Sequence, residues 1–148
     1  MLRASIELFR SDPAVANVFL FRENKLAQYS SGLIARARGK WAKSQADMAT
    51  KVTFDPTRFD KWYQNISLYE AEFSPGSTAG LPIFHIEHKQ ISQPDVITTL
   101  LGFLGAKPAP PGDAPPERKT NHVLERFTNP EAAAVLLERI GKPEWASE

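Results

Sequence analysis

Residues 18–41 read VFLFRENKLAQYSSGLIARARGKW, and this stretch contains the strand-to-helix transition that decides the fold class. Residues 18–21 are continuously apolar, which favours a strand covered on both faces. After Asn24, a residue type that commonly caps helices, apolar residues recur at helical spacing. Gly39 is expected to end this helix, because glycine readily adopts the left-handed conformation found there. A buried strand that leads directly into a helix is typical of α/β proteins.

The next part of the chain continues this alternation. Asp55-Pro56 places a capping side chain before a proline at the first helical position, and therefore predicts a helix start. Residues 81–88 are predicted to form a second strand. The helix after Pro56 carries an aromatic and aliphatic stripe that we expect to face the core: Phe59, Trp62, Ile66, Tyr69 and Phe73.

Two further helices are expected, each opened by proline and closed by glycine. They begin near Pro94 and Pro130 and end at Gly105 and Gly141. Their predicted inward residues are Val96, Ile97, Leu100, Leu101 and Leu104 in the first helix, and Val135, Leu136, Leu137 and Ile140 in the second.

This order of elements predicts a single α/β domain, residues 1–148, with a parallel sheet flanked by helices. Such a sheet normally has about four or five strands. Because only two are predicted, part of the sheet is expected to be missing.

Composition and charge exclude several function classes. The 148 residues include 18 basic and 17 acidic side chains, so the net charge gives no general case for nucleic acid as a partner. There is no cysteine, which excludes disulfides and thiolate chemistry. No apolar run approaches the roughly 20 residues of a membrane span, and a cytoplasmic location is expected.

Arg22 is the first candidate site residue, because it directly follows the predicted strand at 18–21. In open α/β sheets, ligands bind beyond the carboxyl ends of the strands. An arginine fork suits phosphate, and Ser30 or Ser31, about two turns into the next helix, could add a hydroxyl donor. The alternative is an arginine that ends a strand in water, followed by two serines that face solvent.

The same residues resemble the 3′-phosphate-binding segment of sulfotransferases that use PAPS (3′-phosphoadenylyl sulfate), most closely the bacterial nodulation-factor and trehalose enzymes. Further similar features are KVTFDP at 51–56, the FLG ending of a helix at 103–105, and RKT at 118–120. The pattern covers about residues 17–145. The positions shared in the first segment are, in order, Arg22, Asn24-Lys25-Leu26, Ser30 or Ser31, Ile34-Ala35 and Gly39-Lys40-Trp41.

The resemblance implies a P-loop-like parallel sheet and a PAPS donor site that needs no metal. Arg22, one of Ser30 and Ser31, and Lys119 would hold the 3′-phosphate, and both serine spacings suit the family. The reaction implied is transfer of a sulfuryl group to a carbohydrate or glycolipid hydroxyl. No residue matches the family's general base, so the catalytic residues are unassigned.

The sequence also departs from the family. The loop that would bind the 5′-phosphosulfate is expected before Leu2, so the chain resembles the carboxyl-terminal portion, with the first strand and phosphate loop missing and little activity expected from this chain alone. Residues 84–91, FHIEHKQI, lack the usual acidic pair after the second strand. His85 and Glu87 would share one strand face and His88 the other, so no metal site is expected.

Two other functions remain open. One is a truncated, non-catalytic relative that acts as an anion- or nucleotide-binding or interaction module. The other is an anion- or nucleic-acid-binding module that uses the basic cluster at residues 36–43. That cluster is expected to be a solvated helix end, because cations are favourable near the negative end of the helix dipole.

Overall fold

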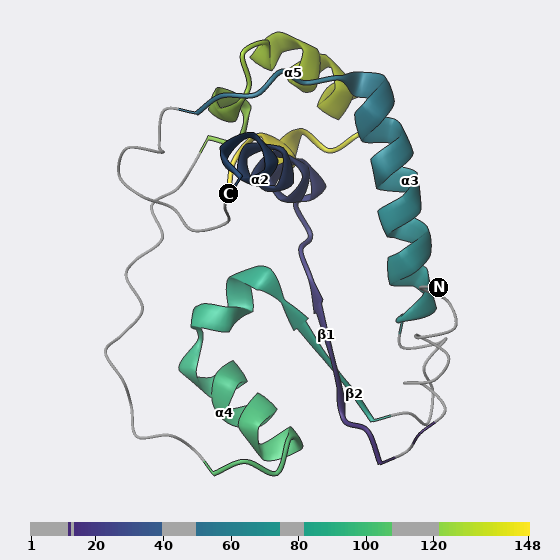
Figure 1. The fold of residues 1–148 in the computed structure, drawn as a ribbon, viewed down its shortest axis with the longest axis vertical. Helices are drawn as coiled ribbons and strands as arrows, with labels where there is room; N and C mark the ends of the chain where they lie inside the picture. The colour runs from purple at the N-terminus through teal and green to yellow at the C-terminus, as the bar shows by residue number, and fades with distance from the viewer. Residues whose placement is uncertain (1–11, 13, 40–49, 75–81, 108–121) are drawn as a thin grey trace. The chain divides into compact units, whose positions relative to one another are not determined.

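The computed structural model describes residues 12, 14–39, 50–74, 82–107 and 122–148. These residues form four α-helices, two β-strands and three 3₁₀ helices (Figure 1). In chain order they are β1 (Asn17–Phe21), α2 (Lys25–Arg38), α3 (Pro56–Glu72), β2 (Ile83–Glu87), η2 (His88–Ser92), α4 (Pro94–Phe103), η3 (Leu124–Arg126), α5 (Pro130–Arg139) and η4 (Pro143–Ala146). The mixed α/β class expected from the sequence is therefore confirmed.

The sheet of the described residues consists of β1 and β2, which pair in parallel. The register runs from Asn17 opposite Ile83 to Phe21 opposite Glu87. Paired residues point to the same side of a parallel sheet, so alternate positions of the two strands build two distinct faces.

One sheet face carries Phe19, which packs in an aromatic cluster. Its ring centroid lies 4.8 Å from that of Phe73, just beyond α3, and 5.7 Å from that of His85 on β2. The carbonyl of Phe73 also makes a hydrogen bond with the His85 ring. The end of α3 therefore covers this face.

The opposite face shows that the expected two-sided burial of β1 was wrong. Val18 is 42% exposed and Leu20 is 53% exposed. Helix α4 contacts β2 rather than β1 through its aromatic ring: the centroid of Phe103 on α4 lies 5.5 Å from that of Phe84 on β2. The continuously apolar run at residues 18–21 predicted the strand β1 correctly, but it did not indicate that α4 would cover β2 and leave β1 exposed on this face.

The helix boundaries follow the predicted capping chemistry. Asn24 Oδ1 accepts a hydrogen bond of 2.9 Å from the backbone N–H of Ala27 at the start of α2. Gly39 ends α2 with a φ of 67°, in the left-handed region that glycine tolerates best. Asp55 Oδ1 accepts from the backbone N–H of Arg58 at 3.1 Å, which begins α3 as expected.

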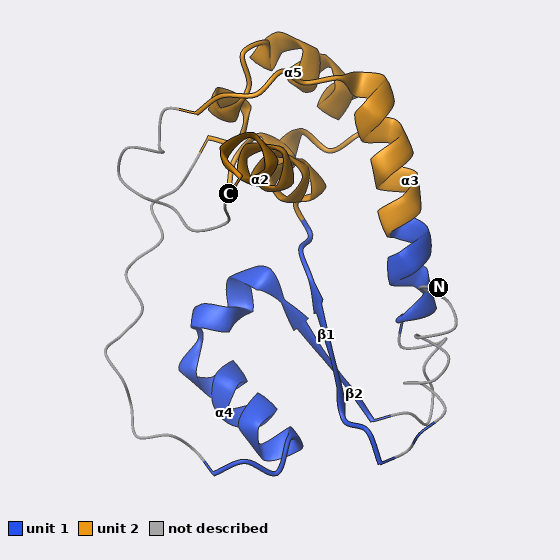
Figure 2. Ribbon diagram, viewed as in Figure 1, with its two compact units in different colours: residues 1–23, 67–117 blue, residues 24–66, 118–148 orange. Residues whose placement is uncertain are grey.

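The chain divides into two compact units, residues 1–23 with 67–117 (unit 1) and residues 24–66 with 118–148 (unit 2) (Figure 2). Helix α3 contributes residues to both units. The described core of unit 2 joins α2, α3 and α5, and its largest fully buried apolar side chains are Phe59, Phe127, Leu26, Leu137 and Val123.

Two of the predicted inward residues point outward. Val135 is 66% exposed, because α5 packs through Ala133, Leu136 and Leu137, which share one helical face that excludes position 135. Leu104 is also exposed, since α4 ends at Phe103. The helices were predicted correctly, but Val135 was assigned to the wrong face and Leu104 to a helix that ends one residue before it.

Candidate anion-binding site

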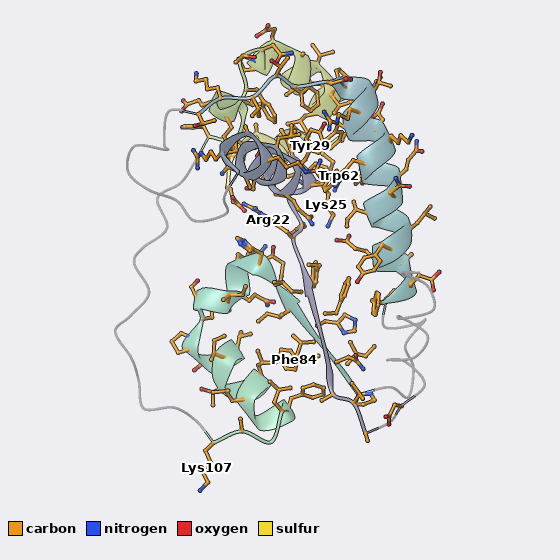
Figure 3. All side chains as sticks on the ribbon, viewed as in Figure 1. Arg22, Lys25, Tyr29, Trp62, Phe84 and Lys107 are labelled. Carbon is orange, nitrogen blue, oxygen red and sulfur yellow. The ribbon has the colours of Figure 1, made fainter. Side chains whose placement is uncertain are left out.

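Arg22 directly follows β1 and lies at its carboxyl end, as the sequence predicted (Figure 3). The neighbouring backbone N–H of Glu23 donates to Glu87 Oε1 at 3.3 Å, which joins the ends of the two strands. Lys89 Nζ lies 3.2 Å from Glu23 Oε2, and both side chains are exposed. The carboxyl edge of the sheet is therefore rich in charged groups around the end of β1.

Ser30 and Ser31 lie on α2 in unit 2. Ser30 is fully buried, and its hydroxyl donates to the carbonyl of Ala27 at 3.0 Å. The hydroxyl of Ser31 donates to the same carbonyl at 2.8 Å. Each hydroxyl has one hydrogen and two acceptor lone pairs, so both serines act as acceptors toward their other neighbours in this conformation.

Arg126, at the end of η3, contacts both serines. Its Nη1 donates to Ser30 Oγ at 3.1 Å and to Ser31 Oγ at 3.5 Å, and lies 3.4 Å from the carbonyl oxygen of Ala27. A guanidinium is a planar fork of donors that keeps its charge at any physiological pH. The structure therefore brings a permanent positive charge to the serine pair.

Sequence reasoning missed Arg126, because this residue belongs to none of the motifs that carry the resemblance. The signal available in the sequence was its position between the apolar residues Val123 and Phe127, which are buried in the structure. A basic residue between two core residues is held close to the core, where its charge needs oxygen acceptors. Which acceptors it meets depends on a packing contact with α2, about 96 positions away in the chain.

The carboxyl-terminal segment of the chain completes this site. Glu148 Oε2 lies 3.5 Å from Arg126 Nη2. Asn24 Nδ2 donates to the carbonyls of Trp145 at 3.1 Å and Ser147 at 3.0 Å, so the residue that caps α2 also binds this segment. The site in unit 2 therefore contains two hydroxyls, a guanidinium and a carboxylate.

Tyr29 lies beside the serines on α2 but belongs to the core. Its ring centroid is 5.2 Å from those of Phe59 and Trp62. Figure 3 labels Tyr29 and Trp62. Burial raises the pKa of the Tyr29 hydroxyl above its usual value, and within the described residues this hydroxyl has no hydrogen-bond partner. Tyr29 therefore supports α2 from the inner side and is not a candidate ligand.

The remaining predicted site residues lie elsewhere. Lys119 is outside the described residues, as are Lys40 and Lys43 of the basic cluster. Arg22 belongs to unit 1 and the serines to unit 2, so the contacts that define the site in unit 2 are those with Arg126. No group of three or more potential metal-ligating side chains occurs in the part of the chain that the structure describes.

Comparison with known proteins gives no relative: no family model, no characterised protein and no solved structure matches this chain. A search of the described residues finds no helix that is both long enough and apolar enough to span a membrane. The features that point to a function are therefore the sequence pattern and the contacts among Ser30, Ser31 and Arg126.

Proposed function

We propose that this chain is a sulfotransferase-like protein that binds a 3′-phosphorylated adenine nucleotide, either PAPS or its product adenosine 3′,5′-bisphosphate. The observation that carries this proposal is the gathering of the Ser30 and Ser31 hydroxyls against the guanidinium of Arg126. The helix that bears these serines follows β1 and Arg22 in the order that the resemblance implies. The parallel β1–β2 pair would form part of a P-loop-like sheet.

The chemistry of the cluster suits a phosphate monoester. Hydroxyls and a guanidinium are donors, and hydrogen bonds from charged donors to phosphate are short and comparatively strong. The hydroxyl hydrogens of Ser30 and Ser31 are bonded to Ala27 in this conformation. On binding, one hydroxyl would rotate toward the phosphate, and the choice between the two serines stays open.

By the resemblance alone, Arg22 and Lys119 are further cationic donors proposed for the 3′-phosphate. Sulfuryl transfer to a carbohydrate or glycolipid hydroxyl would then depend on positioning the donor and acceptor and on neutralising charge in the transition state. No metal is required for such a step, and no residue is assigned as the general base.

Calorimetry with adenosine 3′,5′-bisphosphate and AMP tests this proposal, because the two ligands differ by the 3′-phosphate. A charge-assisted contact is worth roughly 1.5–3 kcal/mol, so the bisphosphate should bind at least about tenfold more tightly. Arg22→Ala should remove most of this preference, and Arg22→Lys should restore only part of it, because an ammonium cannot reproduce the fork.

Arg38→Ala is a suitable control, because this variant removes one arginine charge from the far end of α2. Arg38 Nε donates to Thr50 Oγ1 at 3.3 Å, away from the serine pair. This variant should change binding only slightly, and mainly at low salt. Equal binding of the two nucleotides by the unmutated chain would refute the proposed function, and a large Arg38 effect would indicate a site in the basic cluster instead.

A further inference from the structure

In unit 2 the Arg126 guanidinium already has an anionic neighbour from the same chain, the carboxylate of Glu148. The Glu148 carboxylate lies 3.5 Å away, and the two side chains are 16% (Arg126) and 31% (Glu148) exposed. Hydrogen bonds between guanidinium and carboxylate groups are usually about 2.7–2.9 Å long. The longer separation and partial exposure indicate a weak ion pair that a better-fitting anion can replace.

The position of Glu148 does not depend on this ion pair alone. The backbone N–H of Val123 donates to the carbonyl of Ala146 at 2.9 Å, and Asn24 donates to two carbonyls of the same segment. His122 and Ser147 also form an isolated antiparallel bridge. These contacts hold the segment beside α2 and η3, so a change in the Glu148 side chain should leave the backbone in place.

We propose that Arg126 is a direct ligand of the phosphate, and that the Glu148 carboxylate occupies the same position until the phosphate displaces it. This inference rests on the proposed function, which assigns the serine pair to a phosphate, and adds a further ligand and an intramolecular competitor. A phosphate monoester has the advantage over Glu148, because it presents three oxygens and up to two negative charges to the fork and the hydroxyls. The carboxyl-terminal segment thus lowers the affinity of the free chain for anions.

The test compares Glu148→Gln with Glu144→Gln. Both variants remove one negative charge from the same segment, but Glu144 lies 3.4 Å from Lys142 Nζ rather than beside Arg126. Calorimetry is carried out with adenosine 3′,5′-bisphosphate and, separately, with inorganic phosphate. Glu148→Gln should raise the affinity for both ligands about twofold to fivefold, whereas Glu144→Gln should change it less than twofold.

Arg126 variants provide the second arm of the test. Arg126→Ala should lower the affinity for both ligands at least about tenfold, and in this background Glu148→Gln should have no further effect. Arg126→Lys retains the charge, which keeps the test valid if the alanine variant does not fold. This lysine variant should bind less tightly than the unmutated chain but more tightly than the alanine variant.

The outcomes separate this inference from the proposed function. Equal gains in both glutamine variants, or unchanged binding in Arg126→Lys and Arg126→Ala, would overturn the inference. If the chain prefers the bisphosphate over AMP but Glu148→Gln has no effect, the nucleotide function stands and the competitor does not. If the two nucleotides bind equally and Glu148→Gln still raises the affinity for inorganic phosphate, the competitor stands and the nucleotide function fails.

Discussion

The two units bury different amounts of apolar surface among their described residues. In unit 2, Phe59 and Leu26 have no exposed surface, and Phe127 has only 1%. In unit 1, Ile86, at 3% exposed, is the one buried apolar side chain among the described residues. Because burial of apolar surface is the main favourable term in folding, unit 2 should be the more stable of the two.

The difference also affects the candidate site. Unit 1 relies on aromatic contacts between partly exposed rings, such as those of Phe19 and Phe73. The serine pair and Arg126 lie in unit 2, next to fully buried side chains. Ligand groups supported by a packed core lose less freedom on binding, so the better-packed unit is the more suitable location for an anion site.

The largest expected effect tests the packing difference directly. Phe59→Ala in unit 2 should lower the free energy of unfolding by about 3–5 kcal/mol, because it removes a fully buried ring and leaves a cavity. Phe84→Ala in unit 1 should cost less than half as much, because Phe84 is only partly buried. Urea denaturation of the two variants measures both values. Equal losses would show that the two units are packed alike.

An intermediate effect is expected at the polar groups that cap the helices. Asn24→Ala removes the cap of α2 and the bonds to the carbonyls of Trp145 and Ser147, and should cost about 1–2 kcal/mol. The matched change in unit 1 is Gln90→Ala, where Gln90 Oε1 accepts a 2.9 Å bond from the backbone N–H of Glu87. Thermal melts should show a smaller loss there, below about 1 kcal/mol. A larger loss for Gln90→Ala would contradict the greater cohesion of unit 2.

The smallest effect concerns the buried hydroxyl in the core of unit 2. Tyr29→Phe should be neutral or stabilising by up to about 1 kcal/mol near pH 7, because it removes a buried polar group without a partner in the described residues. Burial raises the folded-state pKa of the Tyr29 hydroxyl, whereas in the unfolded chain this hydroxyl ionises near its ordinary pKa of about 10. Above that pH the unfolded chain therefore loses the proton more readily than the folded chain, which favours unfolding. Stability should therefore fall as the pH rises above about 10, and Tyr29→Phe should reduce this fall. Melts at pH 7 and pH 10.5 give the comparison, and a clear loss at pH 7 would indicate a partner for the hydroxyl.

Local sequence signals were sufficient for most element boundaries. The apolar run at residues 18–21, the cap at Asn24 and the stop at Gly39 predicted β1 and α2 within about a residue. These features depend on groups a few positions apart, so their geometry follows from the chain itself. Arg22 was placed correctly at the end of β1 for the same reason.

The sequence by itself therefore determined the α/β order, the helix caps and the position of the serine pair on α2. Only the tertiary structure decided that α4 contacts β2 while Val18 and Leu20 stay exposed, and that Arg126 meets the serines. The Arg126 bond to Ser30 joins residues 96 positions apart, and the Asn24 bond that holds the carboxyl-terminal segment spans 121 positions. Such contacts depend on how whole helices pack, because helical period and capping chemistry specify a helix and its apolar face without specifying its neighbour.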